Sequence, residues 1–136
     1  MRMTDFVASS ALCLATVTAA APALAADFYD HNGSLMELSV HADRVTIRYH
    51  DPKPSLSRLG VRPGTLLFEG YYSGRGLEGT AYVFRAGCQP AGYSVAGPAV
   101  ADGIILSGAA PVRPKGSCRV TGYTRNSGNA RLEFWQ

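Results

Sequence analysis

The stretch that decides the fold is MELSVHADRVTIRYH, residues 36–50. Its apolar residues occupy every second position on both sides of a short break at Ala42-Asp43. They are Met36, Leu38 and Val40 before the break, and Val45, Ile47 and Tyr49 after it. A period of two is typical of a strand with one face on a core and the other in water. The stretch therefore predicts a β-hairpin that turns at Ala42-Asp43.

The same rhythm continues along the chain, where Pro and Gly separate short runs rich in Val, Ile, Leu, Tyr and Phe. Further strands are expected at 65–72, 77–86, 93–96, 104–109, 119–123 and 130–135, with turns at 73–76 and 126–129. Short strands at such spacing are typical of all-β folds. We predict a small barrel or sandwich of about eight short antiparallel strands, with no helix longer than a turn after residue 25.

Residues 51–64, DPKPSLSRLGVRPG, differ from the rest because their three prolines and two glycines exclude a strand. Within them, residues 55–59 predict one helical turn that ends at Gly60. This is the longest irregular segment of the chain. Since binding residues concentrate on loops held by a rigid scaffold, we expect it to take part in binding.

Residues 1–25 have the pattern of a secretory signal peptide. Arg2 precedes an apolar and small-residue run at 6–21, Pro22 breaks that run, and Ala23 and Ala25 are the small residues that precede a cleavage site. Cleavage there predicts one periplasmic or secreted domain, residues 26–136. The leader is too short for a permanent membrane span, and no later run approaches the roughly 20 apolar residues that a span requires.

Two cysteines remain in the exported domain, Cys88 and Cys118, because Cys13 lies in the leader. An even pair in a small exported domain predicts a disulfide bond. The alternative is a redox-active or metal-binding pair, which would ordinarily have a two-residue spacing that is absent here.

The formal net charge is only +3 at pH 7. The basic residues form no run, so the sequence does not predict a nucleic-acid partner. An excess of Arg over Lys is compatible with recognition of carboxylate or phosphate, or with solvated sheet faces encoded by a GC-rich genome.

Catalytic patterns are scarce. The chain has no Gly-x-Ser-x-Gly motif and no phosphate-binding loop. Glu69 and Glu78 flank the 73–76 turn and would approach each other across a hairpin, as the acid pair of a glycosidase does, but a domain of this size has little room for the substrate groove. We expect a non-catalytic protein without a cofactor.

The histidines and neighbouring aspartates are the candidate ligands for a metal ion. Four side chains gather at one end of the predicted hairpin, although no spacing fixes two of them on one element. They are His31, His50, Asp30 and Asp51. We expect exposed strand-end residues there and no metal.

The aromatic residues offer one candidate contact. Tyr71 and Tyr72 are adjacent in a predicted strand, so they point to opposite faces and one of them is exposed. An exposed Tyr beside Arg75 or Arg85 predicts a contact patch for protein or glycan, with a cross-strand surface pair as the alternative.

Five runs resemble an uncharacterised family of small exported domains from alphaproteobacteria. They are HNGSLM (31–36), YHDPKPSL (49–56), GVRPGTLLF (60–68), GTAYVF (79–84) and GSCRVTGY (116–123). The resemblance covers nearly the whole exported domain and implies its extent, but no mechanism.

Ser73-Gly74-Arg75 and Arg85-Ala86-Gly87 are similar to two motifs of the periplasmic inhibitors of c-type lysozyme. That resemblance implies an eight-stranded barrel whose serine and basic residue face the catalytic acids of the lysozyme cleft. The second motif here lacks the Trp-x-Lys character of the family, and the spacing differs.

Together these features predict a non-catalytic binding or envelope-accessory domain whose partner is another protein or an envelope glycan. The alternatives are an inhibitor of c-type lysozyme and a small cell-wall-directed hydrolase. The expected binding surface combines the 51–64 loop with the 73–75 turn and their neighbours. It comprises Lys53, Arg58, Arg62, Tyr71, Ser73, Arg75 and Arg85.

Overall fold

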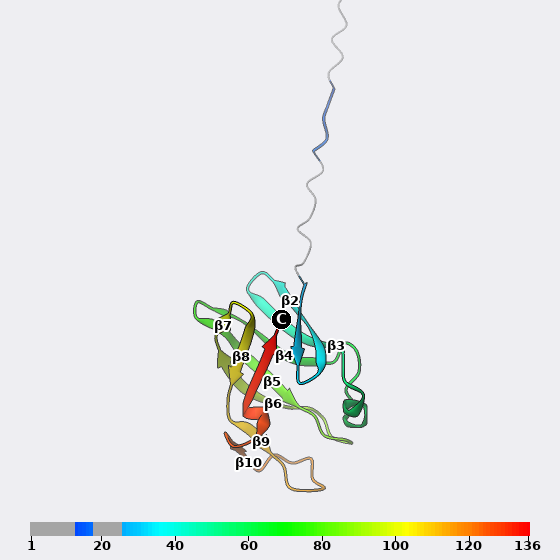
Figure 1. Cartoon of the computed structure of the whole chain (residues 1–136), viewed down its shortest axis with the longest axis vertical. Helices are drawn as coiled ribbons and strands as arrows, with labels where there is room; N and C mark the ends of the chain where they lie inside the picture. The colour runs from blue at the N-terminus through cyan, green and yellow to red at the C-terminus, as the bar shows by residue number, and fades with distance from the viewer. Residues whose placement is uncertain (1–12, 18–25) are drawn as a thin grey trace, which may run out of the picture.

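The computed structural model describes residues 13–17 and 26–136 (Figure 1). Residues 13–17 have no regular secondary structure. The remainder of the expected signal peptide lies outside the described residues, so that feature stays a prediction.

Strands dominate the described part of the chain. In order, they are β1 (Ala26–His31), β2 (Ser34–His41), β3 (Arg44–Asp51), β4 (Leu66–Ser73), β5 (Gly76–Val83), β6 (Ala91–Gly97), β7 (Ala99–Val100), β8 (Gly103–Ser107), β9 (Ala110–Val112), β10 (Gly122–Thr124) and β11 (Arg131–Trp135). Two short 3-10 helices accompany them, η1 (Pro54–Leu59) and η2 (Gly128–Ala130).

Eight of these strands close into an antiparallel barrel. The order is β11-β1-β2-β3-β4-β5-β6-β8, and β8 pairs with β11 to complete the ring. β7 extends the edge of β8, while β9 and β10 form a separate two-stranded sheet. The predicted all-β class is confirmed, and of the two expected architectures the chain adopts the barrel.

The hairpin at 36–50 turns at Ala42-Asp43, as predicted, and a bulge shifts its register between Leu35 and Met36. His41 pairs with Arg44 across the turn, and Ala42 adopts a left-handed conformation with φ 57°. The alternating apolar residues face the interior, since Met36, Val45 and Ile47 are fully buried. The apolar residues of the alternating pattern are therefore the ones that face the barrel interior in both strands.

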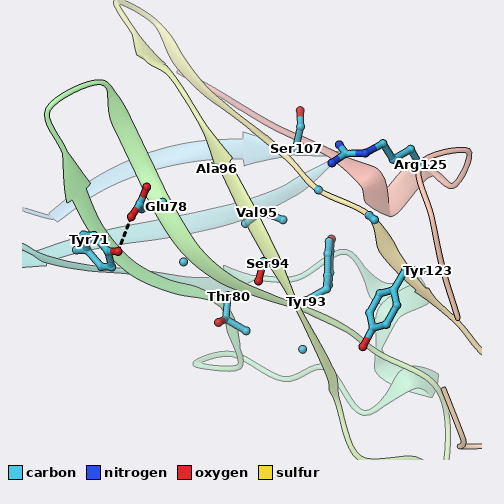
Figure 2. Close-up of a pocket in the computed structure, with 14 residues that line it drawn as sticks. Tyr71, Glu78, Thr80, Tyr93, Ser94, Val95, Ala96, Ser107, Tyr123 and Arg125 are labelled. Atoms are coloured by element: carbon cyan, nitrogen blue, oxygen red, sulfur yellow. Dashed lines mark hydrogen bonds between the residues drawn. The ribbon is translucent and has the colours of Figure 1, made fainter. Parts of the chain in front are cut away.

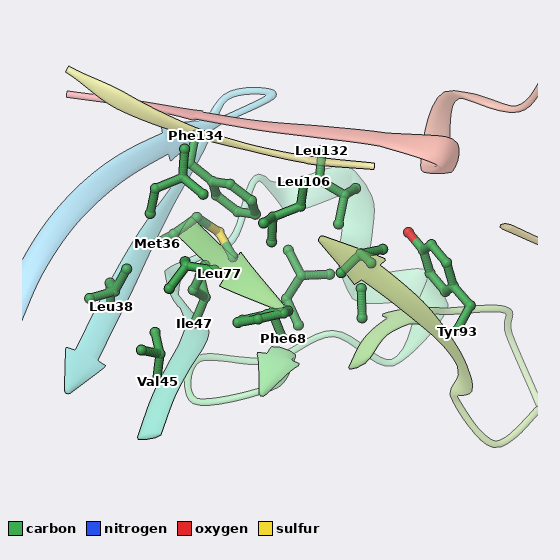
Figure 3. Close-up of a cluster of buried hydrophobic side chains, with 14 of the residues drawn as sticks. Met36, Leu38, Val45, Ile47, Phe68, Leu77, Tyr93, Leu106, Leu132 and Phe134 are labelled. Carbon is green, nitrogen blue, oxygen red and sulfur yellow. The ribbon is translucent and has the colours of Figure 1, made fainter. Parts of the chain in front are cut away.

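The interior of the barrel is filled by side chains (Figure 3). Phe68 and Phe134 are the largest fully buried residues, and Met36, Ile47 and Leu106 pack among them. At one end of the barrel, Leu56 and Leu59 of η1 pack against this core. η1 confirms the predicted helical turn, and it ends at Gly60, whose φ of 87° is left-handed.

Three details of the strand assignment were predicted incorrectly. β1 was not expected, because its inward positions include the polar residues Asp27 and His31 and break the apolar alternation. The strand predicted at 77–86 ends at Val83, since residues 84–90 form a loop. The strand predicted at 119–123 shrinks to β10, which pairs with β9 outside the barrel.

The seam between β6 and β8 is one of two thin joints in the barrel. β6 and β8 share one register pair, Ala96 with Ser107, as β1 and β11 do at Asp30 and Trp135. A Cβ at Gly97 would overlap the carbonyl oxygen of Ile105, and a Cβ at Gly108 would overlap that of Ser94. The missing side chains therefore let the two backbones cross in close contact.

The predicted disulfide between Cys88 and Cys118 is present, with a Cα–Cα distance of 5.3 Å. Beside it, the Arg85 guanidinium donates to the carbonyls of Pro114 (2.8 Å) and Ser117 (2.7 Å). Arg113 is buried and donates in the opposite direction, to the carbonyl of Val83 at 3.0 Å. Two arginines and the disulfide thus hold the 113–118 loop against the end of β5.

Candidate functional site

A groove of about 820 Å³ lies on the outer face of the barrel, next to the β6–β8 seam (Figure 2). Its floor comes from β5, β6 and the segment after β8, and β10 forms one wall. Small residues make up the floor: Thr80, Gly92, Ser94, Ala96, Ser107 and Gly108.

Strand alternation explains why this surface is hollow. Tyr93 and Val95 point into the barrel and are buried, so their neighbours Ser94 and Ala96 face outward. Because these outward side chains are short, they leave space that longer ones would fill. The groove therefore has a polar, hydroxyl-bearing floor directly above the core.

One end of the groove is bounded by Tyr71 and Glu78, which are paired across β4 and β5. The Tyr71 hydroxyl donates to the Glu78 carboxylate, as the dashed line in Figure 2 marks. This hydrogen bond, with the charge of Glu78, raises the pKa of Tyr71. Tyr71 is 45% exposed, so it presents an aromatic surface to solvent at this end of the groove.

The other end is bounded by Tyr123 on β10 and by Arg125, which follows it. Tyr123 is 62% exposed, and in Figure 2 it stands on the far side of β6 from Tyr71. Among residues 26–136, neither Tyr123 nor Arg125 has a side-chain hydrogen-bond partner. Both side chains are free to meet a ligand.

Tyr93 supports the groove from below. Its hydroxyl donates to the carbonyl of Asn129 in η2, and burial raises its pKa to about 12. Tyr93 therefore stays protonated and joins β6 to the segment between β10 and β11. This hydrogen bond ties the strand that forms the floor of the groove to η2.

The two glutamates considered for catalysis both lie on the outer face of the β4–β5 hairpin. Glu69 accepts a hydrogen bond of 2.7 Å from the hydroxyl of Tyr82, and Glu78 accepts one from Tyr71. Each carboxylate is thus engaged by a tyrosine, and only Glu78 lines the groove.

The predicted binding residues do not form one surface. Lys53, Arg58 and Arg62 lie on and beside η1, where the Arg62 guanidinium donates to the carbonyl of Ser57 at 2.9 Å. Ser73 and Arg75 lie in the β4–β5 turn. The eight residues of β4 separate the two groups, a length of about 26 Å at 3.3 Å per residue.

The two motifs shared with lysozyme inhibitors are also separated. Arg75 precedes β5 and Arg85 follows it, so the strand places them at opposite ends of the barrel wall. Arg85 further engages its guanidinium with backbone carbonyls of the disulfide loop. Of the predicted residues, Tyr71 alone lines the groove.

The histidines do not gather. His31 is 7% exposed, stacks on Phe134 with ring centroids 4.6 Å apart, and donates through Nδ1 to the carbonyl of Glu133 at 2.8 Å. His50 lies on the outer face, 3.3 Å from the Glu37 carboxylate. In the part of the chain that the structure describes, no group of three or more His, Cys, Asp or Glu side chains is placed to hold a metal ion.

Sequence reasoning did not identify Tyr123, Arg125 and Ser94 as site residues. Tyr123 was predicted only as the last residue of a strand at 119–123. The available signal was its position beside Gly122 in a glycine-rich and basic segment, which lacks the apolar alternation of a barrel strand.

Comparison of the chain with protein-family models, curated proteins and solved structures found no match. Within residues 13–17 and 26–136, no helix has the length and apolar character needed to cross a membrane.

Proposed function

We propose that this protein is a non-catalytic binding module that acts outside the cytoplasm and holds a segment of an envelope glycan in the groove over β5 and β6. The observation that carries the proposal is an open groove with a hydroxyl-bearing floor and an exposed tyrosine at each end. Its volume lies within the range of about 300–1,000 Å³ that is common for small-molecule sites.

The chemistry of the lining supports a sugar chain. A sugar ring has an apolar face, which packs on an aromatic ring, and a rim of hydroxyls, which requires short polar partners. Tyr71 and Tyr123 supply the rings, and Thr80, Ser94 and Ser107 supply the hydroxyls. Arg125 adds a planar cation suited to a carboxylate on an acidic sugar.

Two features support a location outside the cytoplasm. The leader at 1–25 has the residues of a secretory signal. The Cys88–Cys118 bond belongs to oxidising compartments such as the periplasm.

The test is a titration of residues 26–136 with soluble peptidoglycan fragments, followed by calorimetry and by NMR shifts of groove residues. Tyr123→Ala should weaken binding at least tenfold, because it removes one of the two aromatic walls. Tyr72→Ala is the matched control, since Tyr72 is 46% exposed but does not line the groove. Equal affinities of the two variants, or no binding by the unaltered domain, would contradict the proposal.

Inhibition of c-type lysozyme is the second candidate, favoured by the closed eight-stranded barrel and by the exposed Arg75 in the β4–β5 turn. Since Arg85 lies at the opposite end of β5, inhibition would depend on Ser73 and Arg75 alone. The expected result is inhibition that Arg75→Ala abolishes in a lysozyme assay on bacterial cell walls. Full lysozyme activity in an excess of the domain would eliminate this candidate.

A further inference from the structure

Charge is sharply segregated over the surface. Three segments, 52–65, 84–90 and 108–130, contain eight of the twelve cations of residues 26–136 and none of its acidic residues. The eight are Lys53, Arg58, Arg62, Arg85, Arg113, Lys115, Arg119 and Arg125. In the sequence they are scattered over more than seventy positions, so no basic run is visible.

The fold brings the three segments together. The Cys88–Cys118 bond joins 84–90 to 108–130. Segment 52–65 meets 84–90 at a small apolar hollow formed by Thr65, Leu66, Tyr82, Phe84 and Pro90. In Figure 1 all three lie below the label of the C-terminus. We call this region the basic end.

The charge of the basic end is not neutralised by the protein. Five of its cations are exposed: Arg58, Arg62, Lys115, Arg119 and Arg125. The two ion pairs found among residues 26–136 lie elsewhere, between His50 and Glu37 and between Arg131 and Glu133. Uncompensated like charges on one face create a positive potential that attracts an extended anion.

We propose that the basic end docks on a membrane surface that carries anionic lipid headgroups. The cations come from three segments that meet at one end of the barrel, so a planar surface can contact side chains from more than one segment at once. A rod-shaped polyanion would instead match a row of cations along one element. Val112 (39% exposed) and Tyr123 (62% exposed) lie among the cations, and apolar and aromatic side chains of this kind are typical of lipid interfaces.

The basic end shares Tyr123 and Arg125 with the glycan groove, but membrane docking does not require the groove to bind a glycan, and the test keeps the two apart. Residues 26–136 are mixed with phosphatidylcholine vesicles, with or without phosphatidylglycerol, and sedimented. The double variant Arg58→Gln/Arg119→Gln avoids every groove residue. Its control is Arg44→Gln/Arg75→Gln, which removes the same charge from two exposed arginines outside the basic end.

The unaltered domain should bind only the phosphatidylglycerol vesicles, and less tightly as salt rises. The Arg58/Arg119 variant should bind them about 30-fold more weakly, at about 1 kcal/mol for each cation near an anionic surface. The Arg44/Arg75 variant should bind as the unaltered domain does. Both variants should keep the circular dichroism spectrum of the parent.

Three outcomes would overturn the proposal. An equal loss in the two variants would show that net charge, rather than the basic end, governs binding. Binding that is unchanged in the Arg58/Arg119 variant would exclude these side chains. A domain that ignores the vesicles but binds duplex DNA or soluble polyphosphate would have a different polyanion as its partner.

Discussion

At the scale of single residues, the interior tolerates polar side chains because each one has a partner. Ser34 is 1% exposed, and its hydroxyl accepts the amide of Lys53 at 3.0 Å. Arg113 donates to two carbonyls near the disulfide. Within residues 13–17 and 26–136, no buried side-chain nitrogen or oxygen is left without a hydrogen bond. Such groups stabilise the fold only while they remain paired.

His31 makes stability depend on pH. Burial lowers its pKa below the ordinary 6.5, even though the hydrogen bond to Glu133 acts in the opposite direction. Above pH 6.5 both the folded and the unfolded chain hold the ring neutral, so its contribution is complete. As the pH falls below 6.5, the unfolded chain takes up the proton first, and the free energy of unfolding decreases until the folded pKa is passed.

His31→Gln should therefore flatten the pH dependence of the unfolding free energy between pH 6.5 and lower values. Urea titrations at several pH values measure this slope. His41→Gln is the control, because His41 is exposed in the turn of the 36–50 hairpin and its replacement should leave the slope unchanged. A slope that survives in His31→Gln would mean that another group is responsible.

At the scale of elements, the β6–β8 seam is a short joint in the ring, as the β1–β11 joint is. β5 and β6 share seven register pairs, whereas β6 and β8 share one. Closure at this point relies on backbone contact at Gly97 and Gly108 rather than on a long ladder. The groove lies beside this seam, so the hollow and the thin joint have a common origin in the small residues of β6.

Gly97→Ala should lower the free energy of unfolding by about 1–3 kcal/mol, because the added methyl group would overlap the Ile105 carbonyl. Gly122→Ala, where no atom lies within 4 Å of the added group, should change it by less than about 0.5 kcal/mol. Chemical denaturation of both variants provides the measurement. Similar losses in the two would show that the seam has no special sensitivity.

We expect the disulfide to determine the global free energy of unfolding, and Arg85 to determine the local order of residues 113–118. The bond spans 30 residues, and the chain-entropy relation gives it about 3–4 kcal/mol. The Cys88→Ser/Cys118→Ser variant should lose about that much unfolding free energy in urea titrations. Its residues 113–118 should keep the protection of their amides from hydrogen exchange, because Arg85 still binds their carbonyls.

Arg85→Lys should reduce that amide protection although the disulfide is intact, since an ammonium cannot reproduce the planar fork of a guanidinium. Loss of loop protection in the cysteine variant alone would contradict this division.

Strands with a clear alternation of apolar and polar residues could be predicted from the sequence. Strands whose position depends on contacts with distant parts of the chain could not. The 36–50 hairpin and η1 follow from alternation and from Pro54 and Gly60. β1 was not predicted because its inward-facing His31 is held by contacts with Phe134 and Glu133, which lie more than a hundred residues away in the sequence. Tyr123 was misplaced because β10 pairs with β9 instead of entering the barrel.

At the scale of the whole molecule, β11 closes the barrel by pairing with both β8 and β1. Phe134 of β11 points into the core, where it is fully buried. Phe134→Ala should cost about 3–5 kcal/mol. Phe28→Ala, on the outer face with 44% of the residue exposed, should cost about 1 kcal/mol or less. Thermal unfolding of the two variants checks this, and comparable losses would mean that the barrel interior is not the main source of stability.

The candidate site belongs to this largest scale, which is why the sequence indicated so little of it. Net charge and the lack of basic runs gave no hint of the basic end, because its cations come from three distant segments that the barrel and the disulfide assemble. The groove similarly depends on which face of β6 is outward and on where β10 lies. The sequence predicted that alternation exposes one of Tyr71 and Tyr72, whereas both are exposed, at 45% and 46%.

The position of the chain end has a practical consequence for any immobilised assay. The Gln136 amide donates to the Asp102 carbonyl at 2.9 Å, and Figure 1 places this terminus above β9 and β10. A biosensor chip that captures a C-terminal tag would leave the vesicle-facing surface open to the flowing sample. Coupling through amines would instead attach the chip to Lys53 and Lys115, the two lysines of residues 26–136, and would turn that surface toward the matrix.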